Sequence, residues 1–482
     1  MGFGLGASRV VVVGALSLAM GLPHTSASKP IALGHEGRWI TDPAGRVLIL
    51  HGVGVMDYSP PSTPAALGFG DKDAAFLASH GISLVRLGMN WSAIEPRPGR
   101  FDAAYLRSIR STVEALAAHH IYSLLDWHQD DWGLAAAGVD GAPAWATLTD
   151  GLPNPALGYG VGMLADPAQW RAFDNFWSNA KGPGGVGIAD RFAAMLAYYG
   201  RVFRHEPYLL GYDIFNEPNA GSQYPSCISP LGCPLFDRQL TAWYRRVIPV
   251  LRSADPAHLI FYEPNVFFDF GADTNLSAPS DRETGLAFHT YCLGDGAAGA
   301  LPDLPNNAVG CAIEERLELD NALRYGTRTG AALIADEWGA TNDEVTIARQ
   351  TSEFDADLMP WVFWDYRNLV HDIRAAPAGS NVDHAMLSNL DRAYPLAIGG
   401  TPSGWTWDSG ARRFMLRYST TLPNGHLAGG IRTEVYLPTL DYPHGYVTHV
   451  TGARIISGPN ANRLVLENDA RSATVEVTVA AR

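Results

Sequence analysis

The stretch Leu209–Gly221 reads LLGYDIFNEPNAG and joins a continuous apolar run to a polar ending. An apolar run of this length is typical of a strand that is buried on both faces in a parallel sheet. The run ends in Asn216-Glu217-Pro218, and a proline cannot donate the hydrogen bond that would continue a central strand. The carboxyl group of Glu217 therefore stands where a buried strand emerges, and the question is which groups it works with.

Seven further apolar runs occur between Val47 and Tyr366. With the one above they read, in chain order, VLILHGVGV, ISLVRLGMN, IYSLLDWH, LLGYDIFNE, HLIFYEP, LAFHTY, AALIADEWG and MPWVFWDY. Segments with helical spacing separate them, such as DAAFLASHG, YLRSIRSTVEALAAHH, DRFAAMLAYYGRVFRH and RQLTAWYRRVIPVLRSADP. Eight alternations of strand and helix predict an α/β fold, a (β/α)8 TIM barrel over residues 29–396. A doubly wound open sheet is the alternative, but no glycine-rich phosphate loop follows the first strand.

After about Leu396 the pattern changes to short alternating segments separated by Gly, Pro and Asn. They are FMLRYSTT, GIRTEVYLP, GYVTHVTG, ARIISG, NRLVLEN and SATVEVTVAA. This pattern predicts a small C-terminal antiparallel β-sandwich over residues 397–482. We expect it to pack against the barrel, with carbohydrate binding as the alternative.

The N-terminus has the order of a secretory signal peptide, residues 1–28. Arg9 precedes an apolar stretch from Val10 to Leu22, and small residues follow up to a predicted cleavage point near Ala27 or Ser28. An uncleaved membrane anchor is the alternative, although the apolar stretch is short for a membrane span. We therefore expect a secreted protein, with a membrane-associated form as the second reading.

Composition and cysteine usage agree with a secreted globular protein. Of the 482 residues, 47% are hydrophobic and 17% charged, and the net charge of -14 disfavours nucleic acid as a partner. Four cysteines allow three pairings, of which two local disulfides, Cys227–Cys233 and Cys292–Cys311, are the simplest. The sequence contains no Cys-x-x-Cys pair, which argues against a zinc or redox site built on thiolates.

Polar residues end each predicted barrel strand. Because the active site of a TIM barrel lies at the C-terminal ends of its strands, we expect these side chains to converge. In chain order they are His51, Arg86, Asn90, Asp126, His128, Asp130, Asp131, Asn216, Glu217, Glu263, His289, Tyr291, Asp336, Glu337, Trp364 and Asp365.

Two carboxylates on nearly opposite strands can flank a glycosidic bond. At a separation of about 5 to 5.5 Å one carboxylate attacks the anomeric carbon while the other protonates the leaving oxygen. The nucleophile must stay ionised, which a nearby arginine such as Arg86 favours, and the acid must keep its proton, which burial favours. Paired carboxylates at the strand ends therefore indicate glycoside hydrolysis.

The motifs NEP (Asn216–Pro218), HTY (His289–Tyr291) and DEWG (Asp336–Gly339) resemble those of glycoside hydrolase clan A. Together with Arg86, His128 and Trp364 they resemble glycoside hydrolase family 5 over the whole barrel. The resemblance implies retention of anomeric configuration.

By this resemblance Glu217 is the acid/base and Glu337 the nucleophile. Asn216 would bind the sugar 2-hydroxyl, while Arg86 and Tyr291 would position the nucleophile. His128 and His289 would contact the reacting sugar or the catalytic carboxylates, and Trp364 would form the stacking floor.

Other polar residues have weaker signals. Glu263 ends a strand and precedes a proline, but Tyr262 takes the place of the asparagine, so a substrate contact or a buried ion pair is expected rather than direct chemistry. His35 and His51 are expected to be structural. The run HQDD (His128–Asp131) could hold a metal ion, but without a second cluster of suitable spacing it favours sugar hydroxyls, so no metal or cofactor is predicted.

Within family 5 the stretches LLDWHQDDWG, YDIFNEPNAG, ADEWGATND and WVFWDYRN, with the C-terminal sandwich, resemble secreted actinobacterial endoglycoceramidases. That resemblance implies cleavage of the β-glucosidic bond between an intact oligosaccharide and ceramide in a glycosphingolipid. Lys72 and Asp130 are candidate contacts for outer sugars. We expect a monomer that touches a membrane or micelle surface.

Two segments support a lipid substrate independently. The long apolar loop after the third strand, from about Gly133 to Pro167, has no hydrophobic period and is expected to be functional. Phe267, Phe268 and Phe270 could form a channel for lipid chains, or could pack together as a small core. The rival functions are a family 5 endoglucanase or mannanase acting on soluble polysaccharide, and a non-catalytic binding barrel.

Overall fold

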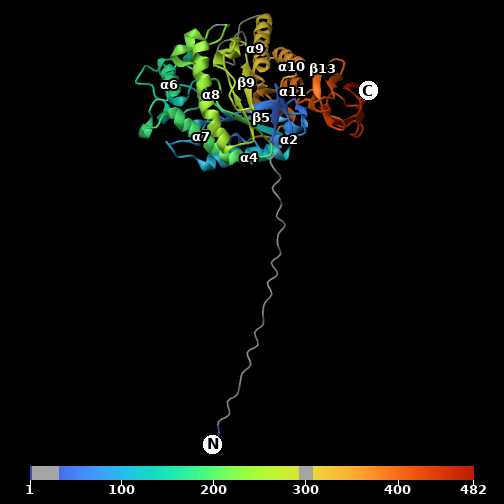
Figure 1. Ribbon diagram of the computed structural model, residues 1–482, viewed down its shortest axis with the longest axis horizontal. Coiled ribbons are helices and arrows are strands. Elements are labelled where there is room, and N and C mark those ends of the chain that lie inside the picture. Colours follow the sequence, from blue (N-terminus) through green and yellow to red (C-terminus); the bar gives the residue numbers. More distant parts are fainter. Residues whose placement is uncertain (3–31, 229, 293–307) are drawn as a thin grey trace.

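The structure, a computed structural model, describes residues 1–2, 32–228, 230–292 and 308–482 (Figure 1). Apart from Met1 and Gly2, the predicted signal peptide lies outside these residues. Among the described helices none is both long and apolar enough to cross a membrane.

Eight parallel strands close into a barrel, which confirms the predicted fold class. In the order in which they pair around the barrel, the strands are β4 (His51–Val55), β5 (Leu84–Met89), β6 (Tyr122–Trp127), β7 (Leu209–Asp213), β8 (Leu259–Tyr262), β9 (Thr284–Thr290), β10 (Ala332–Gly339) and β11 (Trp361–Trp364). Each coincides with one of the eight apolar runs read from the sequence.

Helices surround the barrel and follow its strands (Figure 1). They are α1 (Pro64–Leu67), α2 (Asp71–Ser79), α3 (Trp91–Ile94), α4 (Ala103–Ala118), α5 (Val161–Ala165), α6 (Pro167–Trp177), α7 (Ile188–Phe203), α8 (Pro234–Ala254), α9 (Ala308–Thr329), α10 (Glu344–Asp357) and α11 (His384–Leu390). Short 3-10 turns lie in the loops: η1 (Leu134–Ala136), η2 (Ala144–Ala146), η3 (Pro183–Gly185), η4 (Gly221–Ser226), η5 (Val266–Phe270), η7 (Tyr366–Asn368) and η8 (Gly379–Asn381).

Alternation along the strands decides which side chains enter the barrel. In β5, Leu84 belongs to the apolar cluster inside the barrel, whereas Val85 packs in the layer between the strands and the helices. Because successive side chains point to opposite faces, Arg86 points into the barrel like Leu84. Apolar side chains thus fill the lower part of the barrel, and polar ones of the same parity occupy its C-terminal end.

The C-terminal part consists of two antiparallel sheets, as predicted. Their strands are β12 (Tyr394–Ile398), β13 (Thr401–Asp408), β14 (Arg413–Ser419), β15 (Arg432–Tyr436), β16 (Tyr446–Thr451), β17 (Ala453–Ile455), β18 (Arg463–Asn468) and β19 (Thr474–Ala481). One sheet has the order β13-β14-β19-β16, and a shared core of aromatic and aliphatic side chains lies between it and the other sheet.

The other sheet also contains the first strands of the chain. β1 (Gly34–Glu36), β2 (Trp39–Thr41) and β3 (Val47–Leu48) pair in sequence, and β3 pairs with β12. The predicted boundary after residue 396 falls inside β12, and residues assigned to the barrel from their position in the sequence complete the C-terminal sheet. The alternation signal does not reveal this pairing, because β1 to β3 have only two or three residues each.

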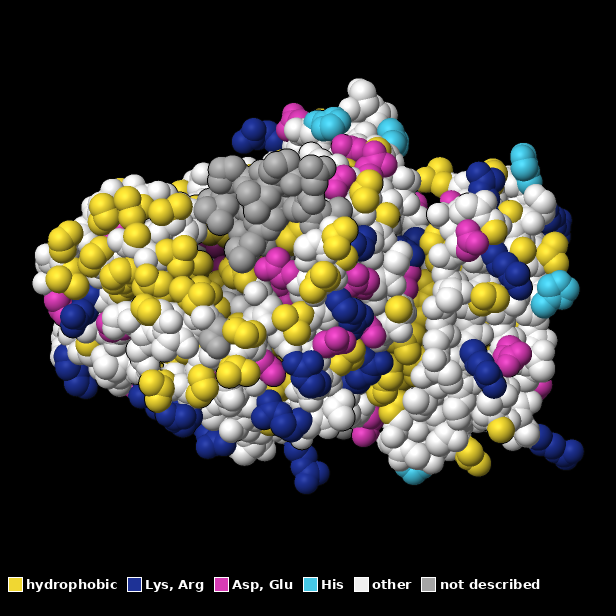
Figure 2. Space-filling view, turned by 90° about the horizontal axis from the view of Figure 1, so that it is seen from above, with side chains coloured by type: hydrophobic (Ala, Val, Ile, Leu, Met, Phe, Trp, Pro, Cys, Tyr) yellow, Lys and Arg dark blue, Asp and Glu magenta, His cyan; other side chains and the backbone are white. Residues whose placement is uncertain are grey.

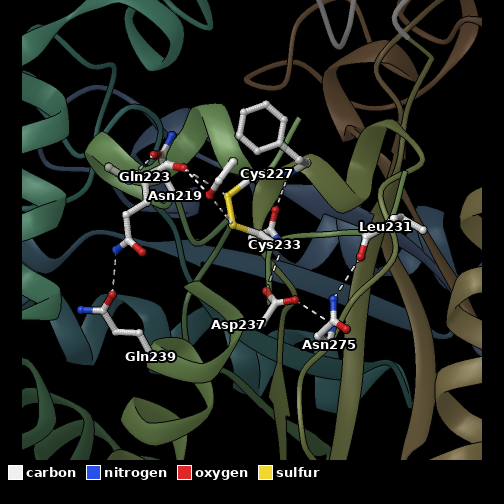
Figure 3. Close-up of a disulfide and its surroundings, with 12 residues drawn as sticks. Asn219, Gln223, Cys227, Leu231, Cys233, Asp237, Gln239 and Asn275 are labelled. Atoms are coloured by element: carbon white, nitrogen blue, oxygen red, sulfur yellow. Dashed lines mark hydrogen bonds between the residues drawn. A yellow bond between two sulfur atoms is a disulfide. The ribbon is translucent and has the colours of Figure 1, made fainter. Parts of the chain in front are cut away.

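Both predicted disulfides are confirmed, Cys227–Cys233 and Cys292–Cys311. The first closes a short loop before α8 (Figure 3). The same figure shows Asn275 beside this loop, where its side-chain amide donates a hydrogen bond to the Leu231 carbonyl (3.1 Å) and its backbone N–H donates one to Asp237 (2.7 Å). The loop is therefore held at both its bridge and its middle.

Candidate active site

Backbone geometry turns Glu337 into the barrel. Ala335 and Trp338 both pack in the layer between β10 and the helices. Strict alternation would send Glu337 outward with Ala335, but the pairing of β10 shifts register between Ala335 and Glu337. Such a bulge re-aims a side chain, so Asp336 and Glu337 can both face the interior.

Arg86 lies at the centre of the site and is fully buried. Its guanidinium donates to Glu337 (2.6 Å), to Asp213 (2.8 Å) and to the side-chain oxygen of Asn216 (2.7 Å). Asp126 (3.3 Å) and Asp336 (3.0 Å) form further ion pairs with it. Burial opposes its charge, but these carboxylates outweigh burial and hold the pKa of Arg86 well above its ordinary value.

Glu337 has the surroundings of an ionised nucleophile. Besides Arg86, the Tyr291 hydroxyl donates a hydrogen bond to it (2.8 Å). Burial by itself would raise its pKa, but the positive charges of His289, Arg86 and His128, with the Tyr291 hydrogen bond, leave the pKa of Glu337 below its ordinary value. A carboxylate kept ionised in a buried site is suited to attack an electrophilic carbon.

Glu217 has the opposite environment. Burial is the main cause that raises its pKa, the charges of Glu337 and Asp130 add to it, and only the interaction with His289 opposes it. The Glu217 carboxyl therefore retains a proton more readily than Glu337 does. Two carboxyl groups whose surroundings move their pKa values apart are the pattern of an acid and a nucleophile.

One imidazole connects the two glutamates. Nδ1 of His289 lies 3.1 Å from Glu217, and Nε2 lies 3.9 Å from Glu337 and 3.3 Å from Glu263. Both predicted catalytic carboxyl groups thus lie within 4.0 Å of the same side chain, on the same rim of the barrel. This arrangement is compatible with a single glycosidic bond between them.

Trp364 and His128 form a flat wall beside the pair. Their rings stack with centroids 5.1 Å apart and planes at 8°. The His128 ring is oriented by Asp126, 2.7 Å from Nδ1, while Asp130 lies 3.5 Å from Nε2. Trp364 remains half-buried, so part of the indole is available for stacking on a sugar ring.

In the described part of the chain, Asn216 keeps a free hydrogen-bond donor for a ligand, whereas the Lys72 ammonium is fully used by backbone carbonyls. The Asn216 amide donates one hydrogen bond to the Gln129 carbonyl (3.1 Å), which leaves its second N–H without an acceptor among the described residues. The Lys72 ammonium donates to the carbonyls of Ile373 (3.2 Å), Arg374 (2.8 Å) and Ala375 (2.6 Å). This geometry supports a loop-anchoring role for Lys72 and gives no support to the expected contact with outer sugars.

Family comparisons agree with this geometry. Residues 69–369, more than half of the chain, match the family described as Cellulase (glycosyl hydrolase family 5). The chain belongs to glycosyl hydrolase family 5. Residues 392–479 match the glycoside hydrolase family 5 C-terminal domain, which includes β12 with the C-terminal sheets.

Within family 5 the chain is similar to endoglycoceramidases. Endoglycoceramidase I of Rhodococcus hoagii is 29% identical over 448 residues, covering 90% of this chain and 85% of the relative. The endoglycoceramidase of Hydra vulgaris is 25% identical, covering 86% and 82%. The structure of endo-glycoceramidase II from Rhodococcus sp. in a cellobiose-like isofagomine complex superposes with a TM-score of 0.77 at 25% identity, covering 92% and 99%.

The family 5 site also contains residues that the sequence analysis missed or placed elsewhere. Glu263, for which a substrate contact or a buried ion pair was expected, forms ion pairs with Arg86 (3.3 Å) and His289 (3.3 Å) and also accepts a hydrogen bond from the backbone N–H of Glu217 (2.8 Å). Gln129 donates to the carbonyls of Asn216 (3.0 Å) and Glu217 (3.1 Å). Asp269 and Asp140 are buried beside His289 and His128, respectively. The strand-end rule found Glu263, whereas the other three residues lie in loops, where that rule does not apply.

The phenylalanines of η5 pack mainly inward. Phe268 is fully buried and meets Phe288 edge to face, with centroids 5.9 Å apart. Phe267 is also buried, and its ring stacks near Tyr224 at 6.3 Å. Of the two interpretations, the small core is therefore the one that these contacts support, and an exposed apolar surface has to come from other segments.

Three groups of described side chains have the composition of a metal site: His128 with Asp130 and Asp140, His289 with Glu217 and Asp269, and His289 with Glu263 and Asp336. In each group an imidazole lies among carboxylates that raise its pKa well above the ordinary value against the effect of burial. An imidazolium supplies the positive charge that such a cluster requires. In each group the protonated imidazole thus balances the negative charge of the carboxylates around it.

Proposed function

We propose that the protein is a retaining endoglycoceramidase, which cleaves the β-glucosidic bond between an intact oligosaccharide and ceramide in glycosphingolipids such as gangliosides. The observation that carries the proposal is the pair Glu217 and Glu337, joined by one imidazole and pushed toward opposite protonation states. The similarity to endoglycoceramidases over nine-tenths of the chain supports the choice of substrate.

The mechanism is a double displacement. Glu337 attacks the anomeric carbon while Glu217 gives its proton to the ceramide oxygen, so the C–O bond breaks and a glycosyl ester with Glu337 forms. Glu217, now ionised, removes a proton from water, and the hydroxide attacks the same carbon. The oligosaccharide leaves, Glu337 is released as a carboxylate and Glu217 is again protonated.

A recess at the C-terminal end of the barrel, largely apolar but with buried polar atoms in its lining, fits the glycan. A cavity of about 380 Å³ lies between the loops that follow β4, β5 and β6, lined by Tyr58, Asn90 and Asp140 among others. Asp140 is 3% exposed, and neither of its carboxylate oxygens has a hydrogen-bond partner among the described residues. The side-chain oxygen of Asn90 is also buried without a partner. Buried acceptors of this kind require donors, and sugar hydroxyls supply them.

An apolar surface on neighbouring loops fits the lipid. Its exposed side chains belong to the loops after β6 and β7: Leu152, Leu157, Val161, Leu164, Ile228, Leu231 and Leu235. The two loops touch, because the Tyr224 hydroxyl donates a hydrogen bond to the Leu164 carbonyl (2.7 Å). Figure 2 shows hydrophobic side chains gathered on the half of this face that lies away from the C-terminal sheets.

The same loop reaches the catalytic centre. Its Gly160 backbone N–H donates to Asp131 (3.0 Å), which follows β6. Neighbouring Tyr159 is half-buried, and desolvation of its hydroxyl together with the charges of Asp130, Glu217 and Glu337 raises its pKa well above the ordinary value. One segment therefore connects the apolar surface to the reacting bond, as expected for an enzyme that takes its substrate from a membrane or micelle.

We also propose that the protein is secreted. Two disulfides and the sequence of residues 1–28 support a secreted protein that meets its glycolipid outside the cell. N-terminal sequencing of the protein recovered from the culture medium tests this. A first residue near 28 or 29 is expected, and retention of the full N-terminus in the membrane fraction would contradict it.

The activity is tested by assaying the purified protein side by side on a ganglioside, a neutral globoside and carboxymethylcellulose. We expect release of intact oligosaccharide from at least one glycolipid. Hydrolysis of carboxymethylcellulose alone would instead establish the family 5 endoglucanase, the second candidate, which the match to the cellulase family favours. Glu337→Ser should abolish hydrolysis while glycolipid binding persists, and wild-type hydrolysis by this variant would overturn the assignment of the nucleophile.

The apolar surface has its own test. We expect Leu157→Ser/Val161→Ser to lower turnover of ganglioside in vesicles at least tenfold and to leave cleavage of a soluble aryl β-glycoside unchanged. Leu427→Ser is the matched control, because Leu427 is 80% exposed on the C-terminal part. Equal losses on both substrates would mean that the loop serves the reaction itself and not the lipid surface.

A further inference from the structure

An acidic side chain interrupts the phenylalanines of VFFDF, residues 266–270, and it is buried. Asp269 is 2% exposed, and its Oδ2 atom has no hydrogen-bond partner among the described residues. Burial raises the pKa of Asp269 well above its ordinary value, and only the charge of a partner can keep the carboxyl group ionised there. Its surroundings should therefore show that partner.

Asp269 faces the imidazole that touches the acid/base. Its Oδ2 lies 3.7 Å from Nδ1 of His289, the same nitrogen that lies 3.1 Å from Glu217. Its backbone carbonyl accepts a hydrogen bond from the N–H of Tyr291 (3.3 Å), whose hydroxyl in turn donates to Glu337. Asp269 is therefore one residue away from each catalytic carboxyl group.

Local structure fixes this position. Asn265 begins the 3-10 turn η5, and its side-chain oxygen accepts from the Phe267 N–H (3.1 Å). The Asn265 amide donates to Asp237 at the start of α8 (3.1 Å). The turn thus directs Phe267 and Phe268 to the core and leaves Asp269 toward β9.

We propose that Asp269 is a positioning residue, which keeps His289 in the charged form and through it sets the protonation of Glu217. The proposal rests on the proposed roles of Glu217 as acid/base and Glu337 as nucleophile. No contact between Asp269 and the substrate is required, because the effect passes through the imidazole.

Every charged group around His289 enters this balance. Carboxyl groups face its ring from the ends of β7 and β8, from η5 and from β10: Glu217, Glu263, Asp269, Asp336 and Glu337. Behind Asp269 lies Glu318 of α9, which is fully buried and whose pKa burial raises well above the ordinary value. Among these, Asp269 is the carboxylate that shares Nδ1 of His289 with Glu217.

Removal of the Asp269 charge has a predictable sign. Burial favours neutral His289, and the surrounding carboxylates, Asp269 among them, oppose it. In Asp269→Asn the imidazole therefore loses its proton at lower pH, and a neutral His289 no longer stabilises ionised Glu217. Loss of the imidazolium charge, 3.1 Å from Glu217, raises the pKa of Glu217, whereas loss of the Asp269 charge itself acts in the opposite direction from within 4.8 Å. The hydrogen-bonded imidazolium is the nearer of the two charges, so the enzyme keeps its acid to higher pH.

The experiment compares pH profiles of kcat/KM on phenyl and dinitrophenyl β-lactosides. For Asp269→Asn we expect the alkaline limb on the phenyl substrate to move up by about half a pH unit or more. The dinitrophenyl substrate, whose leaving group needs no proton, should show little change. Asp255→Asn is the control, because Asp255 is also buried and pairs with a different imidazole, that of His258 (2.6 Å), before the start of β8.

Superposable profiles for Asp269→Asn and wild type would overturn the proposal, as would an equal shift in Asp255→Asn. A second measurement needs no variant at 269. In ¹⁵N-histidine-labelled protein, with His289 assigned by the signal lost in His289→Asn, the ring should be doubly protonated at pH 7.5. A neutral His289 at pH 6 would sink the proposal even if Asp269→Asn failed to fold.

These outcomes are separate from those of the proposed function. Both readouts use soluble aryl glycosides or the free protein, so they do not require glycolipid cleavage. If Asp269→Asn shifts the profile and no glycolipid is cleaved, the positioning role stands and the substrate assignment fails. If Glu217→Ala retains phenyl lactoside hydrolysis, the acid/base assignment fails and the role of Asp269 fails with it.

Discussion

Glu217 combines its chemical position with an unfavourable backbone conformation. Its φ is +46°, in the left-handed region that a residue with a Cβ adopts at a cost of about 1 to 3 kcal/mol. Glu263 holds its N–H and Gln129 holds its carbonyl, so hydrogen bonds on both sides of the residue enforce the conformation. The strain places the carboxyl group toward His289 and not along the strand.

Trp364 depends on the absence of a side chain at position 54. A Cβ built on Gly54 would lie 2.5 Å and 2.8 Å from two carbons of the indole, closer than real contacts allow. We predict that Gly54→Ala displaces the stacking floor and lowers kcat/KM on aryl glycosides by about 100-fold, as small misplacements in active sites do.

Circular dichroism should show the Gly54→Ala protein folded. Gly310→Ala is the matched control, since a Cβ at Gly310 on α9 meets nothing within 4 Å. Wild-type kinetics in Gly54→Ala would mean that the indole yields without consequence, and the position of Trp364 would then not limit the reaction.

At this scale the sequence identified the residues at the ends of strands and missed those in loops. Glu217, Glu337, Arg86, His289 and Tyr291 follow apolar runs, so their convergence could be predicted. Asp140 and Asp269 come from loops whose paths depend on tertiary contacts. Lys72 was predicted as a substrate contact on its charge alone, and the structure gives its ammonium three backbone carbonyls.

Among the elements, β10 shows where periodicity stops being sufficient. Its apolar run predicted the strand, but alternation would have sent Glu337 toward the helices. The register shift that corrects this appears only in the pairing with β9 and β11. A bulge has no reliable signature in a single sequence, which is why the place of Glu337 at the end of a strand could be predicted and its orientation could not.

The loop closed by Cys227 and Cys233 presents Ile228 and Leu231, which are 61% and 78% exposed. We predict that Cys227→Ala/Cys233→Ala lowers the free energy of unfolding by about 2 kcal/mol, the loop-closure value for a bridge this short. Vesicle binding should weaken at the same time, because the apolar side chains are no longer held outward. Aryl glycoside kinetics should not change.

Denaturant unfolding and vesicle sedimentation measure the two effects of this double substitution. The hydrogen bond from Asn275 to Leu231 persists without the bridge, so a loss much larger than about 2 kcal/mol would show that the bridge stabilises more than its own loop.

For the molecule as a whole, His51 marks the joint between the barrel and the C-terminal sheets. Its ring stacks on Tyr394 of β12 with centroids 3.6 Å apart and on Trp361 of β11 at 4.3 Å. Neither ring nitrogen has a hydrogen-bond partner among the described residues. Burial, aided by the charge of Arg392, lowers the pKa of His51 well below its ordinary value.

The sign of the pH effect follows from that shift. Because the folded-state pKa of His51 is below the unfolded one, the unfolded chain binds a proton first, and stability falls as the pH drops below about 6.5. We predict that His51→Phe loses less stability than wild type between pH 7 and pH 5, by up to about 1.4 kcal/mol for each pH unit below 6.5.

Denaturant titrations of both proteins at a series of pH values measure this difference. Asp355 is buried beside Arg392 and has a pKa raised to about 7, so it acts in the opposite direction in both proteins and cancels in the comparison. Parallel pH curves for wild type and His51→Phe would contradict the assignment of this sensitivity to His51.

The pairing of Val47–Leu48 with Ala397–Ile398 has a consequence for biosynthesis. Until the ribosome has synthesised nearly four hundred residues, β3 has no partner strand on the side where β12 will pair with it. The N-terminal end of the barrel, next to these strands, stays uncovered for the same time. Folding of the nascent chain therefore cannot finish vectorially from the N-terminus. A chain that cannot complete its fold until then remains unfolded during synthesis. An unfolded chain is the form that a translocation channel accepts, which agrees with the proposed secretion.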